Sequence, residues 1–373
     1  MRPQSYEIVN PPRSERAVLV GHAGRDGHIS RSLDELALLT DTAGARVIDR
    51  VVQRRGPVHP ATFIGKGKLA ELKTRVEASD ADMVIFDDDL SPAQVRNLEK
   101  AVAVKVVDRS ELILDIFARR ARTREARLQV ELAQLEYTFP RLTGMWKHLE
   151  RQAGGIGTRG PGETQLETDR RLVRERIARL KRDLEAVERE RETQRRKRRR
   201  EFRCALVGYT NAGKSTLFNA LTRSRVFVEN RLFATLDATT RRMVRSDRTT
   251  ALITDTVGFI RKLPHHLVAS FHSTLVEAIE ADLLLHVVDA SEPDFRRQML
   301  AVEGVLGELL ETPRPTTLVF NKSDRVADEA MAAGLRAEFP GCHVVSAVTG
   351  EGLDGLRAQL WELAAENAMK HAS

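Results

Sequence analysis

Residues 208–215 read GYTNAGKS and have the spacing GxxxxGKS, a glycine-containing turn that ends in a lysine and a hydroxyl residue. An apolar run, Cys204–Val207, precedes the turn, and a helical pattern, Thr216–Leu221, follows it. In this strand–turn–helix context the glycines let successive backbone N–H groups wrap a phosphate chain, and the helix N-terminus faces the negative charge. We predict that Lys214 reaches the β- and γ-phosphates of a nucleotide and that Ser215 ligates Mg²⁺.

A second apolar run, Ala251–Thr254, ends in Asp255-Thr256-Val257-Gly258. We expect Asp255 to hold Mg²⁺ from the second coordination shell and the Gly258 N–H to sense the γ-phosphate. The next residue is Phe259, where hydrolases of the Ras type place a glutamine that orients the attacking water. An apolar ring cannot orient water, so we expect slow intrinsic hydrolysis and a site that another component completes.

A third apolar run, Thr317–Phe320, ends in Asn321-Lys322-Ser323-Asp324. The Asp324 carboxylate can accept hydrogen bonds from N1–H and the exocyclic amine of guanine, whereas adenine offers no such pair of donors. Ser346-Ala347 follows a further strand pattern, where a backbone N–H can reach the guanine carbonyl oxygen. These motifs in this order predict a domain that binds GTP.

The residue that closes over the γ-phosphate is expected in FATLD, residues 233–237. We choose Thr235 as the threonine that ligates Mg²⁺ in the GTP state, with Thr239 and Thr240 as alternatives. All three threonines are also compatible with ordinary loop positions. The candidate catalytic residues are Lys214, Thr235 and Gly258, and the candidate Mg²⁺ site consists of Ser215, Thr235 and Asp255. The candidate GTP-binding residues are Gly208, Tyr209, Thr210, Asn211, Ala212, Gly213, Lys214, Ser215, Thr216, Phe233, Ala234, Thr235, Asp255, Thr256, Val257, Gly258, Asn321, Lys322, Asp324, Ser346, Ala347 and Val348.

Three parts of the chain must position these residues. Residues 201–373 read as the P-loop GTPase domain, which the helical pattern Leu353–Met369 closes. Residues 1–112 alternate apolar runs with helical patterns, which predicts a small α/β domain. Its strands are expected at Ala17–Gly21, Ala45–Val52 and Met83–Phe86, and its helices at Leu33–Leu39, Lys68–Val76 and Pro92–Val102. Within it, Ile64–Lys68 (IGKGK) either presents N–H groups and two lysines to a phosphate or is an ordinary turn that opens a helix.

Residues 113–200 form the third part, in which apolar residues recur at spacings of three and four. One series is Leu128, Leu132, Leu135 and Phe139; the other is Val173, Ile177, Leu180, Leu184 and Val187. Two such helices predict an antiparallel helical hairpin, because each apolar seam is too narrow to be stable alone. The connection holds the Gly-rich loop 154–162, which suits close approach to nucleic acid or a flexible linker equally well. The predicted fold class is thus α/β, with a P-loop GTPase domain preceded by a small α/β domain and the hairpin.

Charge is concentrated on this hairpin. The chain has 60 Lys and Arg against 53 Asp and Glu, a net charge of +7. Residues 119–200 hold 24 basic and 13 acidic residues, a balance of +11, so the remainder has a balance of −4. Such segregation indicates either a surface for a large polyanion or a solvated helix face.

Composition excludes several classes of protein. The two cysteines, Cys204 and Cys342, cannot make a disulfide framework; each lies in an apolar run typical of a buried strand. The N-terminus shows no apolar signal core, and no stretch has the roughly 20 apolar residues of a membrane span. We expect a cytoplasmic monomer, with peripheral membrane association as an alternative location.

Beyond GYTNAGKS, FATLD, DTVGF and NKSD, the chain contains GGIGTRGPGETQLETDRR at 154–171 and FIGKGKLAEL at 63–72. With this array it resembles the HflX family of ribosome-associated GTPases over nearly its whole length. The resemblance implies that the N-terminal domain and hairpin bind the 50S ribosomal subunit, with the 154–162 loop directed at rRNA near the peptidyl-transferase centre. It also implies a role in splitting or rescuing stalled or stress-inactivated ribosomes.

The resemblance bears on the ion at the site as well. Similar GTPases use an asparagine at the position of Asn211 to hold a K⁺ that does the work of an arginine finger, although asparagine also simply suits a turn. Alternative functions stay open at this point. They are an RNA-binding or remodelling protein with a regulatory GTPase domain, and a GTPase that acts in RNA maturation or modification or in metal uptake.

Overall fold

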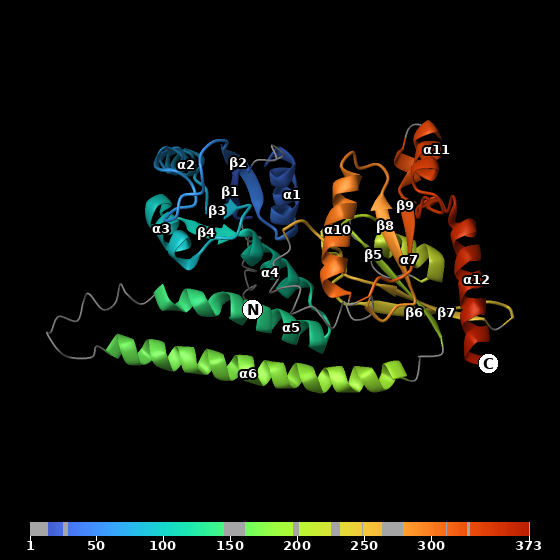
Figure 1. Cartoon of the computed structure of the whole chain (residues 1–373). Coiled ribbons are helices and arrows are strands. Elements are labelled where there is room, and N and C mark those ends of the chain that lie inside the picture. Colours follow the sequence, from blue (N-terminus) through green and yellow to red (C-terminus); the bar gives the residue numbers. More distant parts are fainter. Residues whose placement is uncertain are drawn as a thin grey trace, which may run out of the picture. The chain divides into compact units, whose positions relative to one another are not determined.

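The computed structural model describes residues 14–24, 29–144, 161–196, 201–224, 232–247, 249–262, 279–310, 312–326 and 329–372 (Figure 1). The chain forms two compact units: residues 1–116 with 140–158, and residues 117–139 with 159–373. No helix within the described ranges combines the length and apolarity needed to cross a membrane.

The first unit is built on a four-stranded parallel sheet with the order β2-β1-β3-β4. Its elements are β1 (Arg16–His22), α1 (Ile29–Thr42), β2 (Arg46–Gln53), α2 (Lys66–Ser79), β3 (Met83–Phe86), α3 (Pro92–Val102), β4 (Lys105–Asp108) and the start of α4 (Arg109–Arg120). The expected strands and helices are confirmed, whereas β4 was not anticipated because its two apolar residues are too few to signal a strand. The fully buried Val18, Val84 and Leu98 lie in its core.

The second unit contains a six-stranded sheet with the order β10-β9-β8-β5-β7-β6, in which only β6 runs antiparallel to its neighbour. Its strands are β5 (Phe202–Gly208), β6 (Thr239–Val244), β7 (Thr250–Asp255), β8 (Leu283–Asp289), β9 (Thr316–Asn321) and β10 (His343–Val344). In parallel sheets the carboxyl ends of the strands meet at one edge, where ligands bind. The motifs at Gly208, Asp255 and Asn321 all end strands at this edge.

Helices cover both faces of this sheet (Figure 1). One apolar cluster joins the strands to α7 (Lys214–Thr222) and α12 (Leu353–Ala372). The other joins them to α10 (Phe295–Leu309) and α11 (Glu329–Glu338). The P-loop and α7 are therefore held by a core that depends on residues up to the C-terminal helix.

The helical hairpin consists of α5 (Arg124–Thr138), which the short 3₁₀ helix η1 (Phe139–Gly144) continues, and α6 (Pro161–Arg196). The start of α5 pairs with the end of α6 through Glu125 and Arg191 at 2.7 Å, whereas Phe139 at the other end lies 5.3 Å from the Arg174 guanidinium. The two helices are therefore antiparallel, and Leu180 of the predicted seam is fully buried. Residues 154–160 of the expected loop lie outside the described residues. Pro161 and Gly162 open α6, where proline is well tolerated.

The two cysteines differ from each other. Cys204 is buried in β5, and burial raises the pKa of its thiol. Cys342 is only partly buried and precedes β10 instead of lying within it, so the expectation of a buried strand is wrong there. Its thiol contacts the carbonyl oxygen of Leu335 at 3.7 Å.

Candidate functional site

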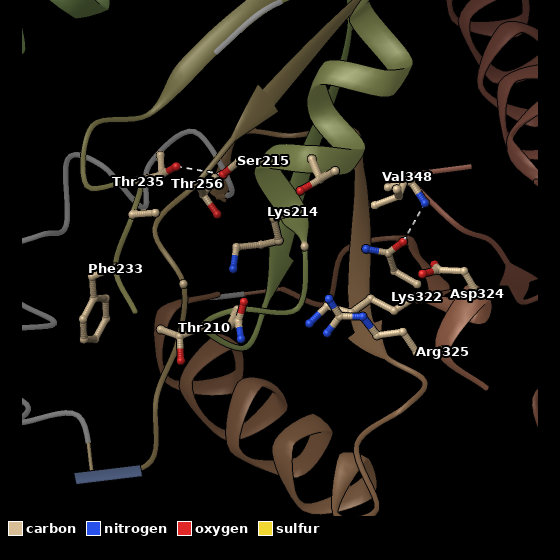
Figure 2. Close-up of a pocket in the computed structure, with 17 residues that line it drawn as sticks. Thr210, Lys214, Ser215, Phe233, Thr235, Thr256, Lys322, Asp324, Arg325 and Val348 are labelled. Carbon is tan, nitrogen blue, oxygen red and sulfur yellow. Dashed lines mark hydrogen bonds between the residues drawn. The ribbon is translucent and has the colours of Figure 1, made fainter. Parts of the chain in front are cut away.

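A cavity of ≈ 250 Å³ lies at the carboxyl edge of the six-stranded sheet. Figure 2 shows Ser215 and Thr235 at one end, Asp324, Arg325 and Val348 at the other, and Lys214 between them. Of the sequence-predicted residues, those that line it are Thr210, Asn211, Gly213, Lys214, Ser215, Thr216, Phe233, Ala234, Thr235, Thr256, Gly258, Asn321, Lys322, Asp324, Ala347 and Val348. The remaining six predicted residues lie outside the lining of the cavity: Gly208, Tyr209, Ala212, Asp255, Val257 and Ser346.

The phosphate-binding wall is the P-loop and the first turn of α7. Gly213 has φ +89°, and a Cβ there would lie 2.3 Å from the Asn321 side-chain nitrogen. Only glycine meets both conditions. Gly208 is under a similar constraint, because a Cβ there would lie 2.2 Å from the carbonyl oxygen of Val287.

Lys214 lies buried at the floor of the cavity. Its Nζ donates hydrogen bonds to the carbonyl oxygens of Gly208 (3.1 Å) and Tyr209 (2.8 Å). Burial lowers the pKa of Lys214 to about 8, and the charge of Asp255 opposes this shift. An ammonium without full hydration gains strongly from an anionic phosphate, which suits the role predicted for this residue.

Three oxygen atoms converge at the other end of the P-loop. The Ser215 hydroxyl donates to Asp255 Oδ2 at 2.6 Å, and Thr235 Oγ1 lies 2.8 Å from Ser215 Oγ and 3.2 Å from the same carboxylate oxygen. Neighbouring ligands of an octahedral Mg²⁺ are about 2.9 Å apart, and this ion prefers oxygen donors. The residues therefore fit Mg²⁺, with Ser215 and Thr235 as direct ligands and Asp255 behind Ser215.

The same geometry separates Thr235 from the two alternative threonines. Thr239 and Thr240 belong to β6, and the Thr240 hydroxyl lies 2.9 Å from that of Thr254. Neither residue lines the cavity, whereas Thr235 does. Thr235 is the threonine whose position fits the ligand role.

Replacing Thr235 with valine is expected to lower the GTP turnover number at least about tenfold, because a bond to a charged centre is lost without a large change in shape. Single-turnover hydrolysis measured across a Mg²⁺ titration checks this and should also show a higher Mg²⁺ requirement. Thr240→Val is the matched control, since its hydroxyl bonds within the sheet. Equal losses in both variants would argue against the ligand role.

The turn after Asp255 packs tightly on the P-loop. Phe259 donates its backbone N–H to Gly208 O at 3.1 Å and accepts from Thr210 N at 2.7 Å. A Cβ on Gly258 would lie 2.9 Å from Thr210 Cα, so this close approach requires glycine. The Phe259 ring is 1% exposed and contributes to the core, which leaves only its backbone at the site.

The guanine end of the cavity is assembled from two loops. Asn321 donates to Ala212 O at 3.0 Å and accepts from Ala347 N at 3.0 Å, so its side chain ties the P-loop to the residues after β10. Asp324 Oδ1 accepts from the Ser346 hydroxyl at 2.6 Å, which orients the carboxylate. Val348 is 77% exposed and offers an apolar surface to a base.

Sequence reasoning missed two residues here. Asp289, at the end of β8, pairs with Lys322 at 2.6 Å and fixes the lysine against the cavity wall. The signal was available, since LLLHVVD is an apolar run that ends in an acid like the other site strands. Arg325, the residue that follows Asp324 in the sequence, also lines the cavity. It belongs to none of the motifs, so no signal in the sequence pointed to it.

A separate cavity lies in the first unit, at the expected Gly-Lys turn. Gly65 caps α2 and donates its N–H to Gln53 Oε1 at 2.8 Å, while Lys68 pairs with Glu71 at 2.6 Å. The Gly65 N–H and one of the two lysines that the phosphate interpretation required therefore have protein partners. The geometry favours the interpretation as a turn that opens a helix.

Comparison with known proteins gives consistent matches along the chain. Three family models match successive segments: "GTP-binding GTPase N-terminal" at residues 30–118, "GTP-binding GTPase Middle Region" at 120–198, and "50S ribosome-binding GTPase" at 203–322.

Two curated relatives, both named "GTPase HflX", match most of the chain. The protein from Lacrimispora saccharolytica is 51% identical over 347 residues, which is 92% of this chain and 81% of the relative. The protein from Escherichia coli K12 is 47% identical over 360 residues, which is 96% of this chain and 84% of the relative.

Among solved structures, the one titled "crystal structure of SsGBP and GDP complex" is similar in fold. Its TM-score is 0.52 at 24% identity, with 95% of this chain and 99% of the other covered. The match covers residues of both units and is not confined to the nucleotide-binding sheet.

Proposed function

Because the chain belongs to the HflX family of GTPases, we propose that this GTP-hydrolysing enzyme docks on the 50S ribosomal subunit and promotes splitting or rescue of stalled ribosomes. The N-terminal domain (1–112) and the hairpin (113–200) are the proposed docking parts, and residues 201–373 are the switch. Binding to the large subunit also agrees with the family model that matches residues 203–322, which describes a 50S ribosome-binding GTPase.

The observation that carries the proposal is an arginine stripe on α6, on the side opposite the seam with α5. It consists of Arg171, Arg182 and Arg189, which recur at intervals that place them on one helix face. Of these, Arg171 pairs with Glu175 of the same helix at 3.3 Å. Other cations of α6 are neutralised by α5: Arg176 pairs with Glu131 at 2.6 Å, and Lys181 pairs with Glu136 at 2.8 Å.

Arg182 and Arg189 are different, because each Nε donates to a backbone carbonyl of its own helix. Their side chains are exposed to solvent, and these hydrogen bonds do not neutralise their positive charge, because the acceptors are backbone carbonyl groups and not carboxylates. A stripe of this kind suits the phosphates of folded RNA, whose contacts with a protein depend mainly on shape and backbone charge.

Hydrolysis is the switch between strong and weak docking. The γ-phosphate contacts that hold Thr235 and the turn after Asp255 exist only before hydrolysis. Ser215 and Thr235 would hold Mg²⁺, which would neutralise the negative charge that develops on the phosphates. Splitting then follows if the GTP form binds separated subunits more tightly than joined ones, because a ligand shifts an equilibrium only by its difference in affinity.

Sedimentation with purified ribosomes tests the function. In a non-hydrolysable GTP analogue the protein should migrate with the 50S subunit, and joined ribosomes should separate; in GDP both effects should weaken. Equal migration in both nucleotides, or none with 50S, would contradict the proposal and favour an output in RNA maturation.

The arginine stripe gives a sharper prediction. The double variant Arg182→Gln with Arg189→Gln is expected to bind 50S subunits more weakly and to lower the slope of log affinity against log salt by about 2. GTP affinity should stay the same, because neither residue lies in the nucleotide cavity. Arg296→Gln with Arg297→Gln changes two exposed arginines of α10, removes the same charge and is the matched control. An unchanged salt slope in the stripe variant would exclude this face as the RNA contact.

Potassium is a further component that we propose for the site. Asn211 is exposed, lines the cavity and has φ +61°, so its carboxamide is available as an oxygen ligand. We expect faster turnover in KCl than in NaCl at equal ionic strength. Asn211→Gly retains the left-handed backbone and deletes the oxygen, so the difference between the two salts should vanish in this variant. If the wild type hydrolyses GTP at the same rate in both salts, the potassium proposal is wrong, and the role of Asn211 is only to adopt the backbone conformation of the turn.

A further inference from the structure

The threonine that closes the metal site is held by residues far away in the chain. Two residues after Thr235, the Asp237 carboxylate accepts hydrogen bonds from Arg122 N (3.2 Å), Thr123 N (3.3 Å) and the Thr123 hydroxyl. These donors lie 114 and 115 positions earlier in the sequence. Arg122 and Thr123 lie immediately before α5, the first helix of the hairpin, and Thr123 is the N-cap of that helix.

This contact is a helix cap supplied from outside the helix. Thr123 is itself the N-cap of α5, and its side chain accepts from Ala126 N at 3.1 Å. A carboxylate at a helix N-terminus is favoured by the helix dipole and satisfies N–H groups that the helix leaves unpaired. Asp237 and the first turn of α5 therefore stabilise each other.

A second contact lies two residues before Thr235. The Phe233 ring meets the Phe117 ring of α4 edge to face, with centroids 4.7 Å apart and an interplanar angle of 83°. Each side chain is 2% exposed. Phe233 has φ +55°, a conformation that a bulky residue adopts only where its surroundings enforce it. The aromatic contact is such an enforcing neighbour.

Thr235 is thus fixed on both sides by the segment that leads into the hairpin, residues 117–123. The nucleotide site supplies its third fixed point, through the Ser215 hydroxyl at 2.8 Å. The reach of a two-residue spacer is short, so displacement of either flanking residue moves the Thr235 hydroxyl away from the ligand position.

We propose that residues 117–123, at the base of the hairpin, are a positioning element for GTP hydrolysis that holds Thr235 in place through Asp237 and Phe233. Coupling of this kind is reciprocal: GTP, which fixes Thr235, stabilises the first turn of α5, and a partner that displaces the hairpin base releases Thr235. The proposal rests on the GTPase activity and not on the ribosomal role.

The decisive variant is Asp237→Ala in the full-length protein, which leaves the Thr123 cap of α5 intact. We expect kcat to fall about 3- to 30-fold, the range of coupling through a packed contact. The ratio of affinities for a non-hydrolysable GTP analogue and for GDP should fall by a similar factor, because GDP does not need the closed threonine. Asp247→Ala, which changes another loop carboxylate of the same unit, is the control.

Hydrogen exchange supplies a readout that a loss of stability alone would not produce. In the wild type the GTP analogue should slow exchange of the Arg122 and Thr123 amides, and in Asp237→Ala it should not. Thr123→Ala combined with Asp237→Ala should reduce kcat no more than one substitution alone, since the two residues act through one contact. Phe117→Leu should lower kcat in the same direction.

Two results would overturn the proposal. One is a kcat and an analogue-to-GDP affinity ratio in Asp237→Ala equal to those of Asp247→Ala. The other is an equal loss of affinity for both nucleotides together with unchanged exchange protection, which would make Asp237 a purely structural residue.

Discussion

Replacing Lys214 with alanine is expected to lower kcat/KM for GTP by about 10²–10³-fold, the cost of removing one preorganised electrostatic group. The group is preorganised because its Nζ is buried and held by the carbonyl oxygens of Gly208 and Tyr209. Burial lowers the pKa of Lys214 to about 8, so the phosphate is its natural counter-charge. Phosphate release over time measures the effect.

The conservative variant sharpens this prediction. Lys214→Arg keeps a positive charge, but a planar guanidinium does not fit between the two carbonyl groups, so we expect no rescue. Melting temperatures of both variants without nucleotide show whether the fold persists. Activity near that of the wild type in Lys214→Arg would mean that the positive charge alone is sufficient for hydrolysis. The fit of the lysine side chain between the Gly208 and Tyr209 carbonyl groups would then not be needed.

Asp324→Asn should change which nucleotide is bound. We expect the carboxylate to accept from the guanine N1–H and amine, so losing two bonds to a charged group should weaken GTP binding about 10²–10⁴-fold. Xanthosine triphosphate should gain affinity, because its C2 carbonyl can accept from the new amide. Competition binding with GTP, xanthosine triphosphate and ATP measures the change.

The matched control for this substitution is Asp354→Asn at the start of α12, whose side chain is 98% exposed and pairs with Arg357. It should bind all three nucleotides as the wild type does. If Asp324→Asn leaves the preference for GTP intact, guanine recognition would have to come from backbone groups near Ala347.

The proposed positioning element gives these site residues a connection to the hairpin. The residues on either side of Thr235 contact the hairpin base. Binding of a partner that shifts the hairpin base would therefore also shift the Thr235 hydroxyl at the metal-ligand position. This would allow an RNA contact on α6 to alter hydrolysis without touching the nucleotide.

Much of the site could be predicted from the sequence because its motifs are contiguous. The wall around Lys214 requires glycines and a lysine at fixed spacing on one turn, and the order of residues already determines that geometry. Asp324 was assigned to guanine for the same reason: it follows a strand whose apolar run ends at the shared edge of the sheet. The seam of the hairpin was visible in its spacing of three and four.

The tertiary structure alone decided the pairings between elements. Spacing offered three threonines, and only packing places Thr235 between Ser215 and Asp255 while Thr240 bonds within the sheet. Lys322 pairs with Asp289, and Asp237 bonds to the N-cap of α5. The residues of each pair are far apart in the sequence, so no periodic pattern predicts these contacts. The physical reason is that local motifs specify backbone shape over a few residues, whereas contacts between distant side chains depend on how whole helices and strands pack.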